Sequence, residues 1–133
     1  MLPTEDQWEY ACRAGSKTAF SCGSETGQLE QYAWFDKNSG GAAHPVGQKK
    51  PNAWGLCDMH GNLWEWCRDG WQDELVGGTD PEGPKSASGR VLRGGSWRYA
   101  AVYCRSASRD WCSPPDRGRY SLGFRLAAVQ SPH

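Results

Sequence analysis

Aromatic rings are the main apolar material of this chain, and they constrain its fold more than any other feature. The 133 residues include eight tryptophans, five tyrosines and three phenylalanines, whereas aliphatic residues are few. A buried tryptophan usually needs a hydrogen-bond partner for its indole N–H. We therefore expect one domain whose core is built from rings and held by polar contacts, and this length suffices for a single core.

Charge and hydropathy exclude several classes of partner. Fifteen basic residues balance fifteen acidic ones, so the net charge is zero, and bulk attraction to nucleic acid or to an acidic membrane is not expected. The longest apolar run covers only a few residues, too few to insert into a bilayer or span it. No secretory apolar segment follows Met1, so we expect no signal peptide in this chain.

The six cysteines are spread along the chain and form no CxxC pair. A zinc ribbon or a thioredoxin-like dithiol is therefore not expected. Buried free thiols that pack as small hydrophobes are the favoured interpretation. A disulfide framework stays open, because the count is even. The six are Cys12, Cys22, Cys57, Cys67, Cys104 and Cys112.

One helix is predicted, near the start of the chain. Thr4 and Gln7 form a capping-box pattern, which predicts a helix over residues 5–14. Residues 16–53 are rich in Gly, Ser, Asn, Asp and Pro, so little regular structure is expected there. A short edge strand at residues 43–47 is the exception, because proline suits sheet edges.

Three further segments have the character of strands. In residues 63–67, Leu63, Glu65 and Cys67 alternate with Trp64 and Trp66, which is the period of a strand with both faces in contact with other parts of the protein. Residues 91–97 and 123–128 are short runs bounded by polar or glycine-rich loops. Glycines inside the second of these allow close approach of another backbone. The sequence therefore predicts the α+β class: a loop-rich domain with short strands and one clear N-terminal helix.

Five strings of residues stand out along the chain: LPTEDQWEYA at residues 2–11, PNAWGLCDMHGNLWEW at 51–66, RVLRGGSW at 90–97, CRSA at 104–107 and GFR at 123–125. Together, and in this order, they resemble the formylglycine-generating enzyme, or sulfatase-modifying factor, family. The resemblance implies a variant C-type-lectin fold and a single domain over residues 1–133. The family's portion upstream of the first string is absent from this sequence, so the domain is expected to be N-terminally short.

The catalytic residues of the family are matched only in part. The resemblance implies that the oxidases bind copper through two cysteines, two residues after the GGSW tryptophan and five residues further on. Here these positions hold Tyr99 and Cys104. Soft thiolates suit Cu(I), and a phenol does not replace one, so no copper is expected. The family's iron-dependent sulfoxide synthases are also not matched, because the only histidines are the scattered His44, His60 and His133.

Two carboxylates bracket the glycine turn at residue 61. Ca²⁺ prefers hard oxygen ligands. From spacing alone, the simpler interpretation is that Asp58 caps a turn and Glu65 pairs with an arginine. The family resemblance instead implies a structural Ca²⁺ held by the side chains of Asp58 and Glu65 and by the carbonyls of Gly61 and Leu63. We therefore expect a structural Ca²⁺ at this turn.

Residues 98–121 lie between two well-matched strings, yet they match the oxidases least. The segment resembles the variable region of proteins diversified by retroelements, in which adenines of asparagine-type codons are mutated. Such codons reach Tyr, Ser, Arg, Asp, Cys, Gly, Ala and Val but not Trp. Trp111, which we also assign to the binding surface, is therefore expected to be fixed or to come from another codon. The residues within the reachable set are Arg98, Tyr99, Ala100, Val102, Tyr103, Ser108, Asp110, Cys112, Ser113, Gly118, Arg119 and Tyr120.

Aromatic residues interleaved with arginines and small polar residues have the composition of an antibody-like binding surface. An ordinary solvated loop with packing tyrosines is the alternative. Four other arginines are expected to anchor loops by binding carbonyls and acids. They are Arg105, Arg109, Arg117 and Arg125.

The sequence therefore predicts a non-catalytic ligand-binding domain of retroelement-diversified type. Its partner is expected to be a protein or a surface molecule that meets residues 98–121, and display on a cell surface or a virion fits this role. A divergent formylglycine-generating-type oxidase acting on a cysteine-containing peptide is the alternative, and Tyr99 disfavours it. The core is expected around Trp8, Trp64, Trp66, Trp97 and Phe124.

Overall fold

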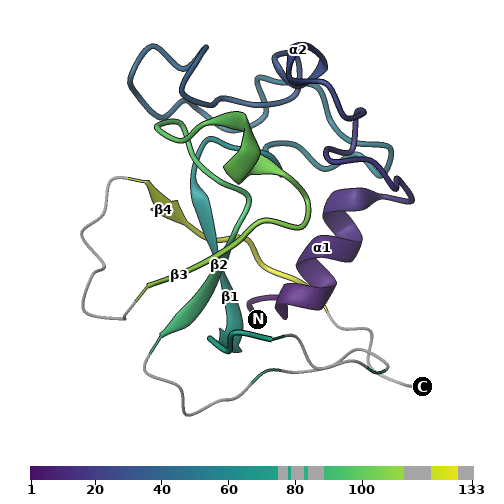
Figure 1. The fold of residues 1–133 in the computed structure, drawn as a ribbon, viewed down its shortest axis with the longest axis vertical. Coiled ribbons are helices and arrows are strands. Elements are labelled where there is room, and N and C mark those ends of the chain that lie inside the picture. The colour runs from purple at the N-terminus through teal and green to yellow at the C-terminus, as the bar shows by residue number, and fades with distance from the viewer. Residues whose placement is uncertain (75–77, 79–82, 84–88, 113–120, 129–133) are drawn as a thin grey trace.

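The computed structural model describes residues 1–74, 78, 83, 89–112 and 121–128. In this part of the chain, helix α1 (Glu5–Arg13) lies beside a four-stranded sheet, and loops with the short helix α2 (Thr26–Leu29) lie above them in Figure 1. A short 3₁₀ helix, η1 (Ala101–Cys104), precedes strand β3. The small sheet, the few helices and the long loops confirm the α+β class.

Helix α1 begins where the capping pattern predicts. The Thr4 hydroxyl accepts a hydrogen bond from the Gln7 backbone N–H at 3.1 Å, and the Gln7 side chain accepts one from the Thr4 N–H at 3.0 Å. These reciprocal bonds satisfy two N–H groups that the first turn would leave open. The helix ends at Arg13 because Ala14 adopts the left-handed conformation, with φ of 47°.

The sheet has the strand order β3-β2-β1-β4. Strand β1 (Trp64–Gly70) pairs with β2 (Arg90–Arg93) in the antiparallel sense and with β4 (Leu122–Gly123) in the parallel sense. Strand β3 (Arg109–Cys112) pairs with β2 in the antiparallel sense, with Leu92 opposite Asp110. The segment after η1 thereby becomes an edge strand of the sheet, held by its pairing with β2.

Side chains alternate between the two faces of this sheet, as a strand period requires. On the helix side, Cys67 and Val91 pack with Trp8 and Cys12 of α1. On the opposite side, Trp64, Leu92 and Cys112 form a second buried cluster. A third cluster lies among the loops and is built from Phe20, Leu29, Ala33, Phe35 and Cys104. Rings carry much of this interior, as the composition predicted.

Several boundaries differ from the sequence-based prediction. The strand expected at residues 91–97 ends at Arg93, because Gly94 and Gly95 have φ of 101° and 71° and turn the chain away. Residues 43–47 form no strand, and the strand expected at 123–128 is paired only at Leu122–Gly123.

The expected core residues are also not all buried. Trp8 and Trp64 are buried, while Trp66 and Trp97 are partly buried. Phe124 is 68% exposed, because it lies beyond the last paired residue of β4 and no described element covers it.

Candidate functional site

The predicted variable segment has an outward and an inward side. Arg98, Val102, Tyr103 and Trp111 are exposed, whereas Tyr99, Ala100 and Asp110 are partly buried. Ser108 and Cys112 were expected on the surface, and the structure instead buries both side chains, because they face the interior beside η1 and β2. Four further predicted surface residues lie outside the described residues: Ser113, Gly118, Arg119 and Tyr120. So does Arg117, which was expected to anchor a loop.

The outward residues of η1 stand on a hydrogen-bonded turn. The carbonyl of Val102 accepts bonds from the Arg105 Nε–H and the Ser108 hydroxyl, both at 2.8 Å. The Tyr103 N–H donates to the Ala100 carbonyl at 3.0 Å. Two side chains therefore hold the backbone turn that presents Val102 and Tyr103: the buried Ser108 and the exposed Arg105.

Strand β3 is fixed to the rest of the fold by a buried ion-pair cluster, the Glu5–Arg93–Arg109 cluster. The Glu5 carboxylate accepts bonds from the Arg93 Nη2 at 3.1 Å and from the Arg109 Nε and Nη2, each at 2.8 Å. Arg93 also donates to the Ser106 carbonyl and to Glu9, each at 2.9 Å. Planar guanidinium groups suit such shared carboxylates. The cluster joins α1, β2 and β3 behind the outward face.

Next to this cluster lies an aromatic platform that the sequence did not reveal. The Trp71 and Trp111 rings stack with centroids 6.4 Å apart, and the Arg109 guanidinium lies 4.5 Å from the Trp71 ring. A Cβ atom at Gly89 would lie 2.5 Å from the Trp111 ring, so only glycine leaves room for that ring. The sequence around Trp71 and Gly89 is a polar loop that contains no recognisable motif. The pairing of β3 with β2 is what brings Trp111 next to these two residues.

The two positions that hold cysteines in the oxidases differ in chemistry and exposure. The Tyr99 ring packs edge-on against Trp64, at 5.5 Å, and against Tyr103, at 5.6 Å. Cys104 is completely buried, and burial raises the pKa of its thiol to about 12. A Cβ at Gly95 would lie 2.5 Å from the Cys104 Sγ, so the backbone closes over the sulfur. One phenol and one buried, protonated thiol do not fit Cu(I).

His60 is a core residue of this region. Its Nδ1 lies 2.7 Å from the Cys104 carbonyl, which only accepts, so Nδ1 carries the proton and Nε2 accepts from the Ser21 N–H at 3.0 Å. Burial lowers the pKa of His60 to about 4. The ring is therefore neutral and fully hydrogen-bonded, and it positions the loop at residue 21 rather than acting as a base.

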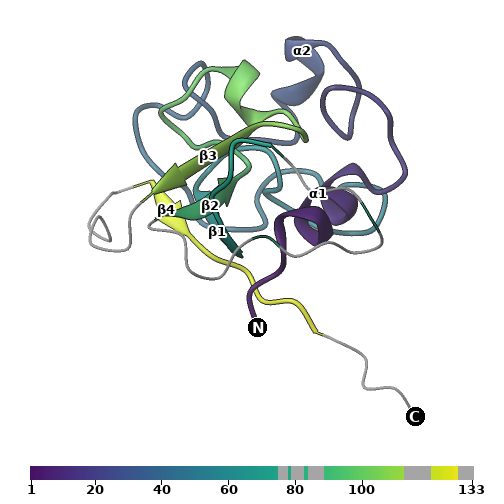
Figure 2. The ribbon, with the colours of Figure 1, turned by 60° about the horizontal axis from the view of Figure 1, so that its bottom comes forward.

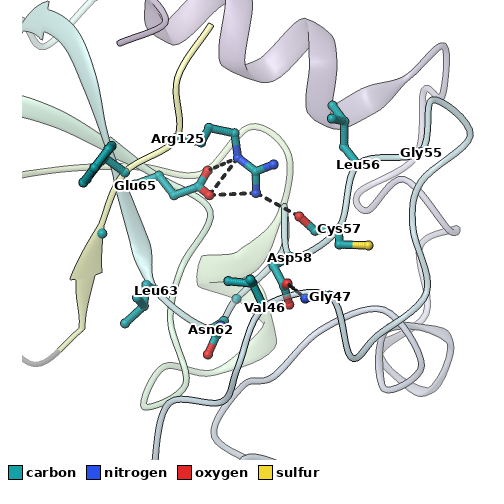
Figure 3. A pocket seen from close by; sticks show the side chains of 13 residues that line it. Val46, Gly47, Gly55, Leu56, Cys57, Asp58, Asn62, Leu63, Glu65 and Arg125 are labelled. Carbon is teal, nitrogen blue, oxygen red and sulfur yellow. Dashed lines mark hydrogen bonds and ion pairs between the residues drawn. The ribbon is translucent and has the colours of Figure 1, made fainter. Parts of the chain in front are cut away.

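The four residues predicted to hold Ca²⁺ line one pocket of about 440 Å³, shown in Figure 3. The Glu65 carboxylate is held by Arg125, with an Nη2–Oε1 distance of 2.8 Å, and by the Trp8 indole N–H. Arg125 also donates to the Cys57 carbonyl at 2.8 Å. This is the anchoring role expected of Arg125, and it neutralises the charge of Glu65.

Asp58 has the other carboxylate of the pocket. Its Oδ2 accepts from the Gly47 N–H at 2.8 Å, and its buried Oδ1 has no hydrogen-bond partner. A buried oxygen without a partner is costly, and it fits a cation. The residues therefore fit a cation bound by Asp58, but not one shared with Glu65 while Arg125 occupies that carboxylate. Among the described residues, no three His, Cys, Asp or Glu side chains gather as a metal cluster.

Comparisons with known proteins agree with this arrangement. A family model, the sulfatase-modifying factor enzyme 1-like domain, matches residues 1–129. The formylglycine-generating enzyme of Mus musculus is 38% identical over 98% of this chain and 40% of its own length. That of Thermomonospora curvata is 35% identical over 96% of this chain and 48% of its own length. The chain thus spans less than half the length of these relatives.

Solved structures give the same fold. Treponema denticola variable protein 1 superposes with a TM-score of 0.85 and 44% identity, over 93% of this chain and 45% of that one. PvdO from Pseudomonas aeruginosa superposes with a TM-score of 0.82 and 31% identity, over 93% and 50%. In the part of the chain that the structure describes, no helix has the length and apolar character needed to cross a membrane.

Proposed function

Because this chain belongs to the family of sulfatase-modifying factor enzyme 1-like domains and has its formylglycine-generating-enzyme-like C-type-lectin fold, we propose that it uses the fold to bind a ligand and does not catalyse formylglycine formation. The observation that carries this proposal is the state of the two oxidase cysteine positions. One is Tyr99, and the other is the buried Cys104. Neither offers an accessible thiolate to a substrate or a metal.

The ligand is a protein or a surface molecule, and it meets the outward side of residues 98–112 with the adjoining residues to 121. Arg98, Val102 and Tyr103 provide the exposed ring, methyl groups and cation of this face. Trp111 is also exposed, but it lies opposite Val91 in the sheet and stacks on Trp71, on the side of the sheet that faces α1. Aromatic and arginine side chains give large contact areas at low entropic cost. The 44% identity with a variable protein supports diversification of this face by a retroelement.

The proposal is tested with two small libraries displayed on yeast. The first randomises Arg98, Val102 and Tyr103, and the second randomises the neighbouring buried positions Ser106, Ser108 and Cys112. Both are sorted for folding and for binding to a panel of purified surface proteins. We expect most members of the first library to fold and to differ in what they bind, while most members of the second fail to fold. Folded members of the first library that share one binding profile would contradict the proposal.

Oxidation of a cysteine-containing peptide is the second candidate, and the 38% identity with the mouse enzyme is the observation in its favour. The test is incubation with a sulfatase-type peptide and Cu(I), followed by mass spectrometry. We expect no formylglycine. Turnover that is lost on Cys104→Ala would instead establish an oxidase that needs only one of the two thiols.

A structural Ca²⁺ at Asp58 stays a prediction of the same fold. A ligand that binds only the folded state stabilises it, by about 2.7 kcal/mol at a concentration of 100 Kd. We expect Ca²⁺ to raise the melting temperature of the unmodified chain and a chelator to lower it, and Asp58→Ala to remove the difference. A melting curve that neither Ca²⁺ nor chelator moves argues against the ion.

A further inference from the structure

The loop that follows α2 forms a tight turn over residues 35–39, and its own groups close it. The Asn38 side chain accepts a hydrogen bond from the Phe35 N–H at 2.9 Å, and the Ser39 N–H donates to the Phe35 carbonyl at 2.9 Å. Phe35 and Ser39 are buried, whereas Asp36 between them is exposed. The backbone at Asp36 is therefore fixed by buried neighbours, while its side chain is accessible to another molecule.

This turn is bonded directly to the start of the proposed binding segment. The Asp36 N–H donates to the Tyr99 carbonyl at 3.0 Å, and the Ser39 hydroxyl donates to the Trp97 carbonyl at 2.8 Å. The Tyr99 ring in turn contacts the Tyr103 ring of η1, with centroids 5.6 Å apart. Figure 1 and Figure 2 both show the blue loop after α2 beside the green η1. Asp36 thus lies at the border of the exposed surface of η1.

Asp36 carries an exposed negative charge at this border. Its carboxylate makes no ion pair with a described residue, although the adjacent Lys37 pairs with Glu30 at 3.1 Å. Burial raises the pKa of the Cys104 thiol, and the negative charge of Asp36 raises it further, so this charge acts on the end of η1. Arg98 is also exposed and makes no ion pair with a described residue. Two charges of opposite sign therefore border the exposed side chains of η1.

We propose that Asp36 is a fixed part of the binding face and that the ligand is a protein that places a lysine or arginine against it. This inference rests on the proposed function and adds to it a contact outside residues 98–121. Protein interfaces have an apolar and aromatic centre and a polar rim. Val102 and Tyr103, 53% and 51% exposed, supply such a centre, and Asp36 lies beside them as a rim charge.

The two charges distinguish a protein from other surface molecules. A sulfated or phosphorylated polymer carries only negative charge, so Asp36 repels it while Arg98 attracts it. A neutral sugar supplies no cation for the carboxylate. A protein surface presents acidic and basic side chains together, and complementary charges at the rim fix the orientation of a partner and raise its rate of association.

The fixed turn suits a face whose other residues vary. The backbone of Asp36 is held before any ligand arrives, so little conformational freedom is lost on binding. Because Asp36 lies outside residues 98–121, the contact stays the same when that segment changes. Different ligands should therefore approach in a common orientation set by Asp36, and Arg98, Val102 and Tyr103 should distinguish between them.

The test starts from yeast-displayed clones, randomised at Arg98, Val102 and Tyr103, that bind a member of the panel of purified surface proteins. Each clone is compared with its Asp36→Asn and Asp36→Glu derivatives by titration with the protein that it binds. Loss of one rim ion pair should raise the dissociation constant about fivefold in Asp36→Asn, whichever protein is bound. Asp36→Glu keeps the charge and should retain most of the affinity.

Asp6→Asn is the matched control, because Asp6 is an exposed aspartate in the first turn of α1 and its substitution changes the net charge equally. It should leave each dissociation constant unchanged. Asp36→Asn keeps the backbone hydrogen bond to Tyr99, and thermal melting shows that each derivative is folded.

Clones that bind equally well with and without Asp36→Asn overturn this inference and leave the proposed function intact. An equal loss of affinity in Asp6→Asn also overturns it, because net charge and not a contact then determines the affinity. So does binding of heparin by the unmodified chain that Asp36→Asn strengthens, because the ligand is then a sulfated polymer. If no clone binds any protein of the panel, the proposed function fails and this inference fails with it.

Discussion

The side chains of residues 98–112 fall into a buried set and an exposed set. Cys104, Ser106 and Cys112 on the inward side are at most 2% exposed. Val102, Tyr103 and Trp111 on the outward side are 46–53% exposed. A single stretch thus contributes both to the hydrophobic interior and to the proposed binding face. Tolerance to substitution in this segment is therefore set residue by residue.

The difference follows from how the segment is attached. The inward side is held by the Glu5–Arg93–Arg109 cluster and by the pairing of β3 with β2. The outward side rests on η1, where the Val102 carbonyl is held by Arg105 and Ser108. Rigid attachment on one side allows the other to vary without loss of the fold, which is the arrangement that a diversified binding surface needs.

The largest expected effect compares two tryptophans of this sheet. Trp64 is 2% exposed and packs on Leu92 and Cys112, whereas Trp111 is 46% exposed. Trp64→Ala should lower the free energy of unfolding by about 3–5 kcal/mol, because it leaves a cavity. Trp111→Ala should cost about 1 kcal/mol, since it loses chiefly the stack on Trp71. Urea denaturation measures both, and equal losses would contradict the two-sided description.

The next effect tests the buried cluster that holds the inward side. Arg93 is 1% exposed and bonds to Glu5, Glu9 and Ser106. Arg93→Met removes one partner and leaves buried acceptors unpaired, so it should cost about 3 kcal/mol. Arg105→Met, on the exposed side of the same segment, is the matched control and should cost less than about 1 kcal/mol. A small loss for Arg93→Met would show that β3 is held mainly by its pairing with β2.

Local patterns in the sequence predicted part of this structure well. The capping pair Thr4 and Gln7 placed α1, and alternation placed β1, because both signals depend on neighbours in the chain. The resemblance to the family predicted the α+β, C-type-lectin-like fold, which the structure and the comparisons confirm. Anchoring by Arg109 and Arg125 also agrees with the hydrogen bonds observed.

What the sequence did not reveal depends on contacts between distant segments. The burial of Cys112 follows from the register of β3 on β2, which no local pattern fixes. Ser108 precedes β3, and its hydroxyl is held by the Val102 carbonyl of η1. The exposure of Phe124 follows from the lack of a described strand beside residues 124–128. Spacing alone favoured the pairing of Glu65 with an arginine, and the structure confirms it. Which arginine was open, because Arg125 lies sixty residues away in the chain.

Substitution of two tyrosines of the predicted surface should lower the free energy of unfolding by different amounts. Tyr99 is partly buried against Trp64, and its carbonyl accepts the Asp36 N–H at 3.0 Å, whereas Tyr103 is 51% exposed. Tyr99→Ser should cost about 1–2 kcal/mol, through lost ring contacts. Tyr103→Ser should cost about 0.5 kcal/mol. Thermal or urea denaturation distinguishes them, and a larger loss at Tyr103 would place Tyr103, not Tyr99, with the scaffold.

The smallest effect concerns the exposed end of the ion-pair cluster and depends on pH. Burial raises the pKa of Glu9, but hydrogen bonds from Arg13 and Arg93 outweigh it and hold that pKa below its usual value of 4.5. The stabilisation by ionised Glu9 is therefore present above the unfolded-state pKa and is lost as the pH falls through the lowered pKa.

Glu9→Gln should accordingly lower the free energy of unfolding by about 0.5–1 kcal/mol at pH 7, an amount reduced by the partial exposure of the pair. This difference from the unmodified chain should shrink as the pH falls below 4.5, because the unmodified chain then loses the same charge. Glu74→Gln, at an exposed position, should show little difference at any pH. Urea denaturation of the three proteins across this range is the measurement. A Glu9→Gln difference that stays constant with pH would show that the ionised carboxylate contributes nothing, and that the inward side of residues 98–112 is held by Glu5 alone.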